Sequence, residues 1–412
     1  MSARRVKLIL ILVLVIFVLF FSNDFGLIDV EKTSIITAIA VDKADDGDYL
    51  VTAQIAVPEA TDKNSENLKA QISGKNSTVG GAIKNLSDLS GWFPKLTFCN
   101  LIIIGNKIVS QEQDNVIKII DYFSKSLRVQ DSALVAVAEN NAYELLDLAT
   151  PLDNISSFAL QKILLKNTGF DKDIASCDIK TFCSGHYSSS GSAYMPIIKP
   201  VKAGVNQQSS QGESQGQGSN SSSSSSQSSS GGQGNDSNKN NLFDAKTTAL
   251  FVHGIKVGEL SSDLTLVFNA LNRSFRETTL SVDHIDFNGQ DTNYLLTVLA
   301  IKPSVKLIAT DNDLVLKINL SLYCKVSDHS ADNSEQALFN NIPIPNEVEL
   351  KAEELLKTSL EELVETCKQT KCDILKIKEK LYRYNHKQYS RYKDNYLEKL
   401  QTDITVSVSG QK

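Results

Sequence analysis

The feature that most constrains this sequence is an apolar run near its start, Leu8 to Phe21, in which every residue is Leu, Ile, Val or Phe. Arg4, Arg5 and Lys7 precede the run, and Ser22-Asn23-Asp24 follows it. Basic residues stay on the cytoplasmic side of a membrane segment, so this order directs the remainder of the chain out of the cytoplasm. We therefore expect an exported protein whose folded part begins after residue 23.

The apolar run has three interpretations. Its 14 residues are short for a membrane-spanning helix, which needs about 20, and they suit the apolar region of a cleaved signal peptide. A buried helix of a folded domain is the third interpretation. We favour an uncleaved anchor over residues 1–23, because no small-x-small cleavage site follows the run. Val6 also lengthens the segment, and Lys7 can extend its ammonium group to the lipid headgroups.

The charge balance argues against a nucleic-acid partner. The net charge is −6 and the pI is near 5.5, whereas nucleic-acid binding leaves a basic footprint. The tyrosines between Tyr382 and Tyr396 alternate with Arg and Lys, and we interpret them as a helix surface or a protein contact. A chain of 412 residues with 41% hydrophobic residues is long enough for two or three domains with real cores.

A low-complexity segment at residues 206–241 divides the exported part. Of its 36 residues, all but Glu213, Asp236 and Lys239 are Ser, Gln, Gly or Asn. Such a segment has no apolar surface to bury and cannot offset the entropy lost on ordering. The composition predicts a disordered linker between an N-terminal exported region, residues 24–205, and a C-terminal α+β domain, residues 242–412.

The N-terminal region begins with two β-branched, apolar runs, at residues 35–41 and 49–57, which predict a β-hairpin around an acidic turn. The turn partly matches a calcium-binding loop, with Asp42, Asp46 and Gly47 at the first, fifth and sixth places. Ala44 and Ala53 occupy places that need oxygen ligands, so we expect an acidic turn. Alternating strand and helix patterns then predict an α/β subdomain over about residues 79–169.

In the C-terminal region, strand patterns precede a long amphipathic helix from Glu347 to Cys367. We predict that its apolar face covers an antiparallel sheet that includes residues 314–326. Its other side carries Glu349, Glu353, Glu361 and Glu365, and we expect this side to be exposed. Glu361 and Glu365 are the candidate partner-contact residues. The fold class is thus predicted as α+β, with about three sheet-plus-helix subdomains behind an N-terminal membrane helix.

Motifs for catalysis, cofactors and metals are not apparent in the sequence. It contains no Gly-rich phosphate loop, no Gly-x-Ser-x-Gly and no HExxH. Cys177, Cys183 and His186 are the only residues with metal-ligand side chains that lie close together in sequence. Their spacing fits no usual set of zinc ligands. Cys177 and Cys183 could instead form a disulfide outside the cytoplasm, and the sequence leaves this open. We predict no catalytic, cofactor or metal residues, and the ligand-binding residues stay unknown.

Five stretches together resemble the C subunit of spore-germination nutrient receptors, the Ger(x)C family. They are the hairpin from Ile35 to Gln54, the strand from Lys95 to Gly105, the stretch from Arg128 to Leu165 with Pro151 and Ile155, the strand pair from Thr248 to Leu260, and the stretch from Cys372-Asp373-Ile374-Leu375 to the final strand. They follow one another in the family's order, and the resemblance covers almost the whole exported part.

The resemblance implies a non-enzymatic exported subunit, made of three α+β subdomains, on the outer surface of the spore inner membrane. It implies a polytopic A subunit and a transporter-like B subunit as partners. The sequence departs from the family where a lipid-attached cysteine usually follows the apolar run, since Ser22-Asn23-Asp24 stands there. The apolar run would then itself be the anchor. Asn100 occupies a place where many members have His, so no role carries over to it.

Three hypotheses for function follow. The first is a membrane-anchored subunit of a germinant receptor, on the exported side of the cytoplasmic membrane, that supports germinant sensing through protein–protein contacts. The second is an exported binding module for a small solute or a cell-wall glycan. The third and weakest is an enzyme, which would need a converging acid–base or nucleophile set.

Overall fold

The protein is represented by a computed structural model that describes residues 7, 11–14, 33–56, 69–111, 115–148, 150, 153, 155–165, 174–202, 241–272, 278–287, 290–330 and 343–410. The predicted linker, apart from Asn241, lies outside the described residues. The predicted anchor lies outside them as well, apart from residues 7 and 11–14. Among the residues described, no helix has the length and apolar character needed to span a membrane.

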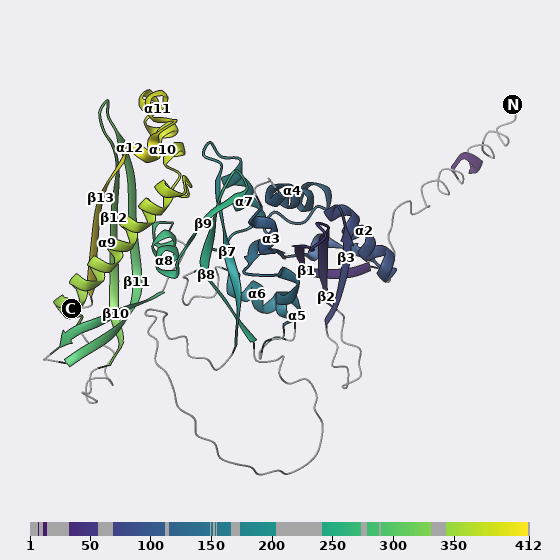
Figure 1. Ribbon diagram of the computed structural model, residues 1–412, viewed down its shortest axis with the longest axis horizontal. Coiled ribbons are helices and arrows are strands. Elements are labelled where there is room, and N and C mark those ends of the chain that lie inside the picture. The colour runs from purple at the N-terminus through teal and green to yellow at the C-terminus, as the bar shows by residue number, and fades with distance from the viewer. Residues whose placement is uncertain are drawn as a thin grey trace, which may run out of the picture.

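The chain folds into two sheets with helices packed on them (Figure 1). The strands are β1 Thr33–Lys43, β2 Tyr49–Ala56, β3 Lys69–Asn76, β4 Phe93–Lys95, β5 Leu101–Ile104, β6 Leu134–Ala138, β7 Ser192–Lys202, β8 Asn241–Val252, β9 Ile255–Leu260, β10 Thr278–Phe287, β11 Gln290–Ala309, β12 Leu314–His329 and β13 Leu400–Gly410. The helices are α2 Val79–Ser90, α3 Asn106–Val109, α4 Asn115–Asp121, α5 Ala142–Asp147, α6 Ser156–Leu164, α7 Ile179–His186, α8 Ser262–Leu271, α9 Asn346–Gln369, α10 Ile377–Tyr384, α11 His386–Tyr392 and α12 Tyr396–Lys399, with a 3₁₀ turn, Leu96–Phe98, and a π-helical turn, Tyr122–Ser126.

The first sheet has nine strands in the order β3-β2-β1-β5-β6-β7-β8-β9, with β4 also paired to β1. Its centre is parallel, from β1 through β5 and β6 to β7, and both sides are antiparallel. The side chains of β5 and β6 are fully buried, as expected for parallel strands covered on both faces. One face packs on α2, α3, α4 and α7, and the other packs on α5 and α6.

The second sheet has four strands in the order β10-β11-β12-β13. The amphipathic pattern of α9 is confirmed, because Val348, Leu356 and Leu360 are buried in the core that also holds Leu316 and Leu320 of β12. The prediction of an antiparallel sheet is wrong at β13, which pairs with β12 in parallel, with Leu314 beside Leu400. Parallel neighbours need a long crossover, and the helices α9 to α12 supply it.

The expectation of about three subdomains differs from the two sheets in the described residues. The hairpin β1–β2 does not stand apart, because β1 pairs with β2 on one side and with β5 on the other. The first sheet also continues beyond the low-complexity segment, since Lys202 of β7 pairs with Asn241 of β8. Leu250 of β8 and Leu260 of β9 belong to the same core as the second sheet. The two sheets therefore share a hydrophobic interior.

Candidate functional site

The two sheets meet at a short segment between α9 and α10, Lys371–Lys376, which we call the joint. The Sγ atom of Cys372 lies 3.4 Å from the carbonyl oxygen of Phe251 in β8. The backbone N–H of Asp373 donates to Oγ of Ser192 in β7, at 2.8 Å. Cys372 and Asp373 are both buried. The joint thus attaches the crossover of the second sheet to two strands of the first.

Asp373 is the central polar residue of the joint. Its carboxylate accepts hydrogen bonds from the backbone N–H groups of Ile377, at 2.7 Å, and Lys378, at 2.8 Å, so it caps the first turn of α10. The residue is only 1% exposed. Burial raises the pKa of Asp373 to about 6, although the two N–H groups and nearby Lys380 act in the opposite direction.

Other ionisable groups around Asp373 are shifted by the same burial. The Lys380 ammonium group donates to the carbonyl oxygen of Leu375, and burial lowers its pKa. Burial and then the neighbouring Asp373 carboxylate raise the pKa of Tyr396. Burial also raises the pKa of the Cys372 thiol to about 12. A thiol that stays protonated is a poor nucleophile, so this cluster suits a structural role better than a covalent one.

The backbone at both ends of the joint is unusual. Lys371 and Lys376 have φ values of 55° and 57°, in the left-handed region that residues with a Cβ rarely adopt. Each such residue costs of order 1–3 kcal/mol and persists only where the surrounding structure imposes it. The four residues between them are all buried, which explains how the joint holds this conformation.

A pocket of about 400 Å³ opens beside the joint, between α7, β7 and α8. Its wall combines apolar surface with charged and polar side chains, which are Lys180, Ser184, Ser192, Asp373, Lys376 and Glu379. These polar groups come from α7 and β7 on one side and from the joint and α10 on the other. The ammonium and carboxylate groups beside apolar surface suit a small zwitterionic solute.

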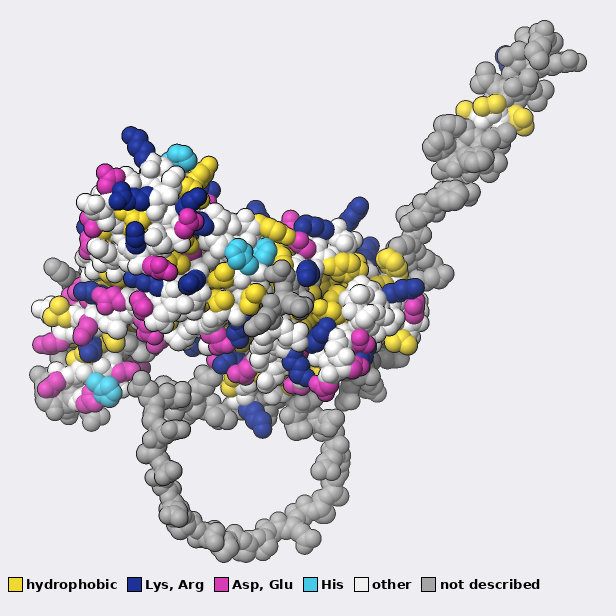
Figure 2. Space-filling model, turned by 45° about the horizontal axis from the view of Figure 1, so that its top comes forward, with side chains coloured by type: hydrophobic (Ala, Val, Ile, Leu, Met, Phe, Trp, Pro, Cys, Tyr) yellow, Lys and Arg dark blue, Asp and Glu magenta, His cyan; other side chains and the backbone are white. Residues whose placement is uncertain are grey.

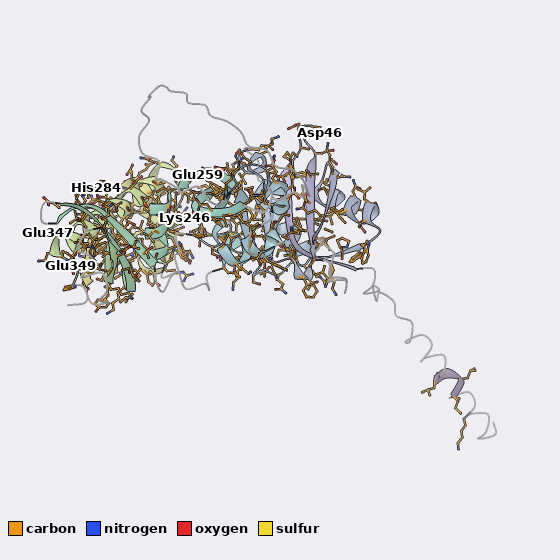
Figure 3. All side chains as sticks on the ribbon, turned by 90° about the horizontal axis from the view of Figure 1, so that it is seen from below. Asp46, Lys246, Glu259, His284, Glu347 and Glu349 are labelled. Carbon is orange, nitrogen blue, oxygen red and sulfur yellow. The ribbon has the colours of Figure 1, made fainter. Side chains whose placement is uncertain are left out.

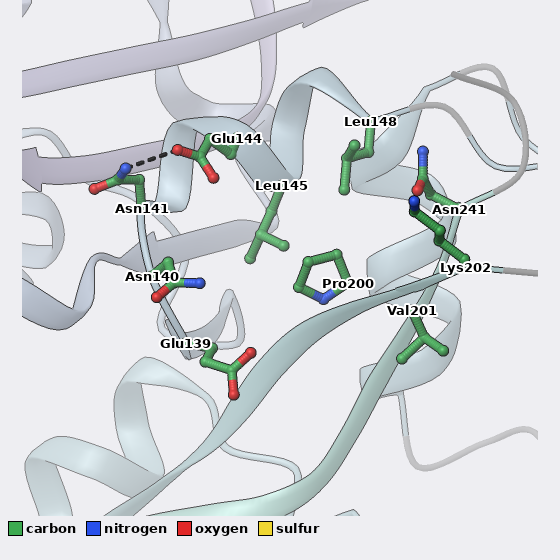
Figure 4. A pocket seen from close by; sticks show the side chains of 10 residues that line it. All are labelled: Glu139, Asn140, Asn141, Glu144, Leu145, Leu148, Pro200, Val201, Lys202 and Asn241. Carbon is green, nitrogen blue, oxygen red and sulfur yellow. Dashed lines mark hydrogen bonds between the residues drawn. The ribbon is translucent and has the colours of Figure 1, made fainter. Parts of the chain in front are cut away.

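A second, smaller pocket of about 240 Å³ lies where β7 ends and β8 begins (Figure 4). Glu139, Glu144 and Lys202 contribute its charges. Asn141 donates to Oε1 of Glu144 at 2.7 Å, the contact drawn as a dashed line in Figure 4. Lys202, which precedes the predicted linker, and Asn241, its last residue, also line this pocket.

The acidic turn after β1 is a set of separate contacts. Asp42 is buried and accepts from the N–H groups of Ala142, at 2.7 Å, and Tyr143, at 2.9 Å, at the start of α5. Asp45 pairs with Lys107 at 2.6 Å, and Asp46 pairs with Lys75. The carboxylates of Asp42, Asp45 and Asp46 are therefore each occupied by a protein donor, in agreement with the acidic-turn interpretation. The residues that the structure describes contain no group of three or more His, Cys, Asp or Glu side chains that could hold a metal ion.

The predicted partner-contact residues lie on one side of α9. Glu361 and Glu365 are exposed, and their neighbours are on the same helix: Lys357 at 4.0 Å and Lys368 at 4.0 Å, respectively. The expectation of a fully exposed acidic side is wrong for two other residues. Glu353 accepts from the N–H of Val408, at 2.9 Å, and Glu349 from the N–H of Gly410, at 2.9 Å.

These two half-buried glutamates bind the outer edge of β13, because the parallel pairing leaves alternate N–H groups of that strand facing away from β12. Glu349 lies at the end of the molecule far from Asp46 (Figure 3). The acidic residues left to face solvent on this side are thus fewer than the sequence pattern indicates.

The cysteine cluster does not converge into one site. Cys183 and His186 are on α7, and Cys177 precedes that helix. None of the six cysteines, all of which the structure describes, forms a disulfide. The joint itself is a site that sequence reasoning missed, because Asp373 lies four residues before Ile377, where α10 begins, whereas the recognised capping signal stands directly before a helix. The sequence does not indicate that this cap is buried between two sheets.

The comparisons with known proteins match both halves of the chain to one family. The model described as "Spore germination protein N-terminal domain" matches residues 27–200. The model described as "Spore germination B3/ GerAC like, C-terminal" matches residues 246–411. No curated protein matches the chain in sequence.

Among solved structures, a "Crystal Structure of the GerBC protein" is similar, with a TM-score of 0.51 and 14% identity over 93% of this chain and 100% of that one. At this identity the likeness supports the fold alone. The two family models, which together cover nearly all of the chain after residue 26 except residues 201–245, support the family directly. The chain belongs to the Ger(x)C family of spore germination proteins.

Proposed function

We propose that this protein is a non-enzymatic, membrane-anchored subunit of a spore nutrient-germinant receptor, and that it supports germinant sensing through contacts with other subunits. The observation that carries the proposal is the match of both halves to spore germination families. The joint adds a physical reason, because Cys372 and Asp373 fix the two halves to each other through buried contacts with Phe251 and Ser192. A rigid two-sheet body can pass a displacement from one bound partner to another.

The proposed partners are a polytopic A-type subunit and a transporter-like B-type subunit, on the exported side of the spore inner membrane. The exposed carboxylates of Glu361 and Glu365 are the proposed contact with one of them. The pair of Glu361 with Lys357 joins two side chains that are about half exposed, and the pair of Glu365 with Lys368 joins an exposed carboxylate to a lysine that is 27% exposed. Ion pairs that reach solvent contribute little to stability. These carboxylates can therefore exchange a neighbouring lysine for a partner's basic group at small cost.

The test is affinity capture of the full chain from spore membranes. The wild type is expected to bring polytopic membrane proteins with it, and E361K/E365K is expected to bring less while unfolding at the same temperature. E362K is the control, because Glu362 is exposed beside Glu361 but points about 100° away from Glu361 and about 60° away from Glu365 around the helix. Equal capture by all three proteins would remove the docking role from Glu361 and Glu365. Capture of no membrane protein would contradict the receptor assignment.

The second candidate function, a binding module for a small solute, is favoured by the pocket of about 400 Å³ beside the joint. Calorimetric titration of the full chain with amino acids and with simple sugars tests it. Heat of binding that disappears in K180A and K376A, while capture of membrane proteins stays intact, would assign the pocket a ligand in addition to the partner contacts. Absence of binding across both compound classes would count against this candidate.

A further inference from the structure

Five large hydrophobic side chains are exposed at one end of the first sheet. They are Ile35, Leu89, Trp92, Phe93 and Phe98, and we call this group the aromatic rim. Leu89 is 75% exposed, and Trp92, Phe93 and Phe98 are about half exposed, at 47%, 49% and 51%. Single exposed apolar residues are ordinary, but a group of this kind marks an interaction surface.

Local hydrogen bonds hold the aromatic rim in place. Helix α2 ends at Gly91, whose φ of 69° reverses the chain. Directly after it, Oγ of Ser87 donates to the carbonyl oxygen of Trp92 at 3.1 Å, and the N–H of Trp92 donates to Oγ of Ser90 at 3.2 Å. Trp92 is thereby fixed to the last turn of α2, which carries Leu89.

Strand pairing brings the other members of the aromatic rim to the same end of the first sheet. Strand β4 pairs in parallel with the first residues of β1, so that Thr33 lies beside Phe93 and Ile35 beside Lys95. The Lys95 ammonium group lies 5.8 Å from the centre of the Phe98 ring. The side chains are therefore held by strand pairing and a helix end, yet they remain uncovered.

The chemistry of the aromatic rim matches the headgroup region of a bilayer. Trp and other amphipathic aromatic residues concentrate at membrane–water interfaces, and Lys places its stem on apolar surface and its ammonium among the headgroups. Lys95 of β4 is exposed next to the aromatic rim. Lys84 and Asp88 are exposed on α2, the helix that also carries Leu89. Figure 2 shows hydrophobic side chains gathered on this end of the surface, whereas charged side chains are more numerous at the opposite end.

The course of the chain points to a membrane as the occupant. Strand β1 begins at Thr33, 12 residues after the end of the apolar run at Phe21. Twelve residues span at most about 40 Å when fully extended. The strand paired with the start of β1 is β4, so the aromatic rim lies about 5 Å, one strand spacing, from the point where the chain enters the fold. An anchor at residues 8–21 would thus keep the rim within reach of the bilayer.

We propose that the aromatic rim rests in the headgroup region of the membrane and holds the end of the first sheet that carries α2 against the bilayer. This inference rests on the membrane anchoring in the proposed function. It goes further, because it fixes which end of the protein faces the lipid and leaves the second sheet and α9 pointing away from it, toward partners.

Trp92 is the only tryptophan in the chain, so its fluorescence reports on the aromatic rim alone. The full chain is reconstituted into vesicles of phosphatidylcholine and phosphatidylglycerol, with and without brominated acyl chains, which quench nearby tryptophan. We expect strong loss of Trp92 emission with the brominated lipid. The matched control is W92F/Y384W, which moves the probe to α10, where Tyr384 is 76% exposed; its emission is expected to be unchanged.

Flotation of the vesicles separates the two levels of the proposal. Protein that floats but whose Trp92 is unquenched by brominated lipid and open to aqueous iodide overturns the inference and leaves the anchor intact. Protein that does not float contradicts the anchor, and the inference falls with it. Trp92 that becomes shielded only in native spore membranes, and not in lipid vesicles, would assign the rim to a protein partner and overturn the inference.

F93S/F98S provides an independent check. Both side chains are about half exposed, so this variant is expected to keep the wild-type unfolding temperature and to float with the vesicles through the anchor. The quenching of Trp92 should fall, because the rim has lost two apolar contacts with the lipid. Quenching equal to that of the wild type would show that the rim does not hold the protein to the bilayer.

Discussion

The clearest consequence of the joint is a pH-dependent stability that one substitution should remove. Asp373 is 1% exposed, and burial raises its pKa from the ordinary value of 3.8 to about 6. A carboxyl group whose pKa is raised by folding stabilises the fold fully only below its unfolded-state pKa. That contribution is lost as the pH rises through about 6, because ionisation is then easier in the unfolded chain.

The size of the effect follows from the two pKa values. A rise from 3.8 to about 6 corresponds to about 3 kcal/mol of unfolding free energy, at about 1.4 kcal/mol per pH unit. Most of this change, about 2 kcal/mol, falls between pH 4 and pH 7. Asp373→Asn keeps the shape of the side chain and cannot ionise. The unfolding free energy of the variant should therefore gain about 2 kcal/mol relative to wild type across this pH range.

The assay is urea unfolding of both proteins at intervals from pH 4 to pH 7. Subtracting the unfolding free energy of wild type from that of D373N at each pH cancels the titration of groups that do not contact Asp373. The contributions of groups that do contact it, chiefly Lys380 and Tyr396, remain. Leu360→Ala is the control, because it removes buried carbon atoms and no titrating group, so its profile should run parallel to wild type. A difference between wild type and D373N that is constant with pH would refute the reasoning that Asp373 is ionised at a cost inside the joint.

Three further predictions concern packing and connection. Leu356→Ala and Leu360→Ala should each lower the unfolding free energy by about 2–5 kcal/mol, because both residues are buried on the apolar face of α9. Leu350→Ala should change the unfolding free energy by less than about 0.5 kcal/mol, because Leu350 is 65% exposed. Replacing residues 206–240 by a short glycine turn should leave the melting temperature almost unchanged, because Lys202 and Asn241 are already paired and a long loop adds little to stability; loss of cooperative unfolding would contradict this. Gly105→Ala should destabilise by about 1–3 kcal/mol, because its Cβ would lie 2.0 Å from Oδ1 of Asp42 and displace the carboxylate from the start of α5. Adding D42A to G105A should then cost less than D42A alone costs in the wild type, which a double-mutant cycle measures.

Local patterns in the sequence determined most of the individual elements. The apolar strands β5 and β6 and the amphipathic helix α9 were predictable, because burial on both faces and burial on one face leave different periodicities. The hairpin around the acidic turn was predictable as well, because β-branched, apolar runs flank the acidic residues. The family resemblance, resting on five ordered stretches, is confirmed by two family models that cover both halves.

The joining of those elements was decided by tertiary structure. The sequence pattern of the β1–β2 hairpin and that of β5 are compatible with two separate sheets or with a single sheet. Only the pairing of β1 with both β2 and β5 joins them into a single sheet. The direction of β13 depends on where the helical crossover ends, which periodicity does not encode. The same is true of Glu349 and Glu353, whose helix pattern predicts a solvent face, whereas the edge of β13 supplies their donors.

The candidate sites show the same division. Sequence alone predicts an anchor before the fold, and it placed acidic residues on α9, because membrane segments and amphipathic helices are local features. The joint and the aromatic rim are not local. Asp373 becomes a buried cap only when two sheets close over it, and Phe93 comes to the start of β1, beside Thr33, only when β4 pairs with β1. Non-local pairing carries no periodic signal in a single sequence, and for that reason these sites needed the folded structure.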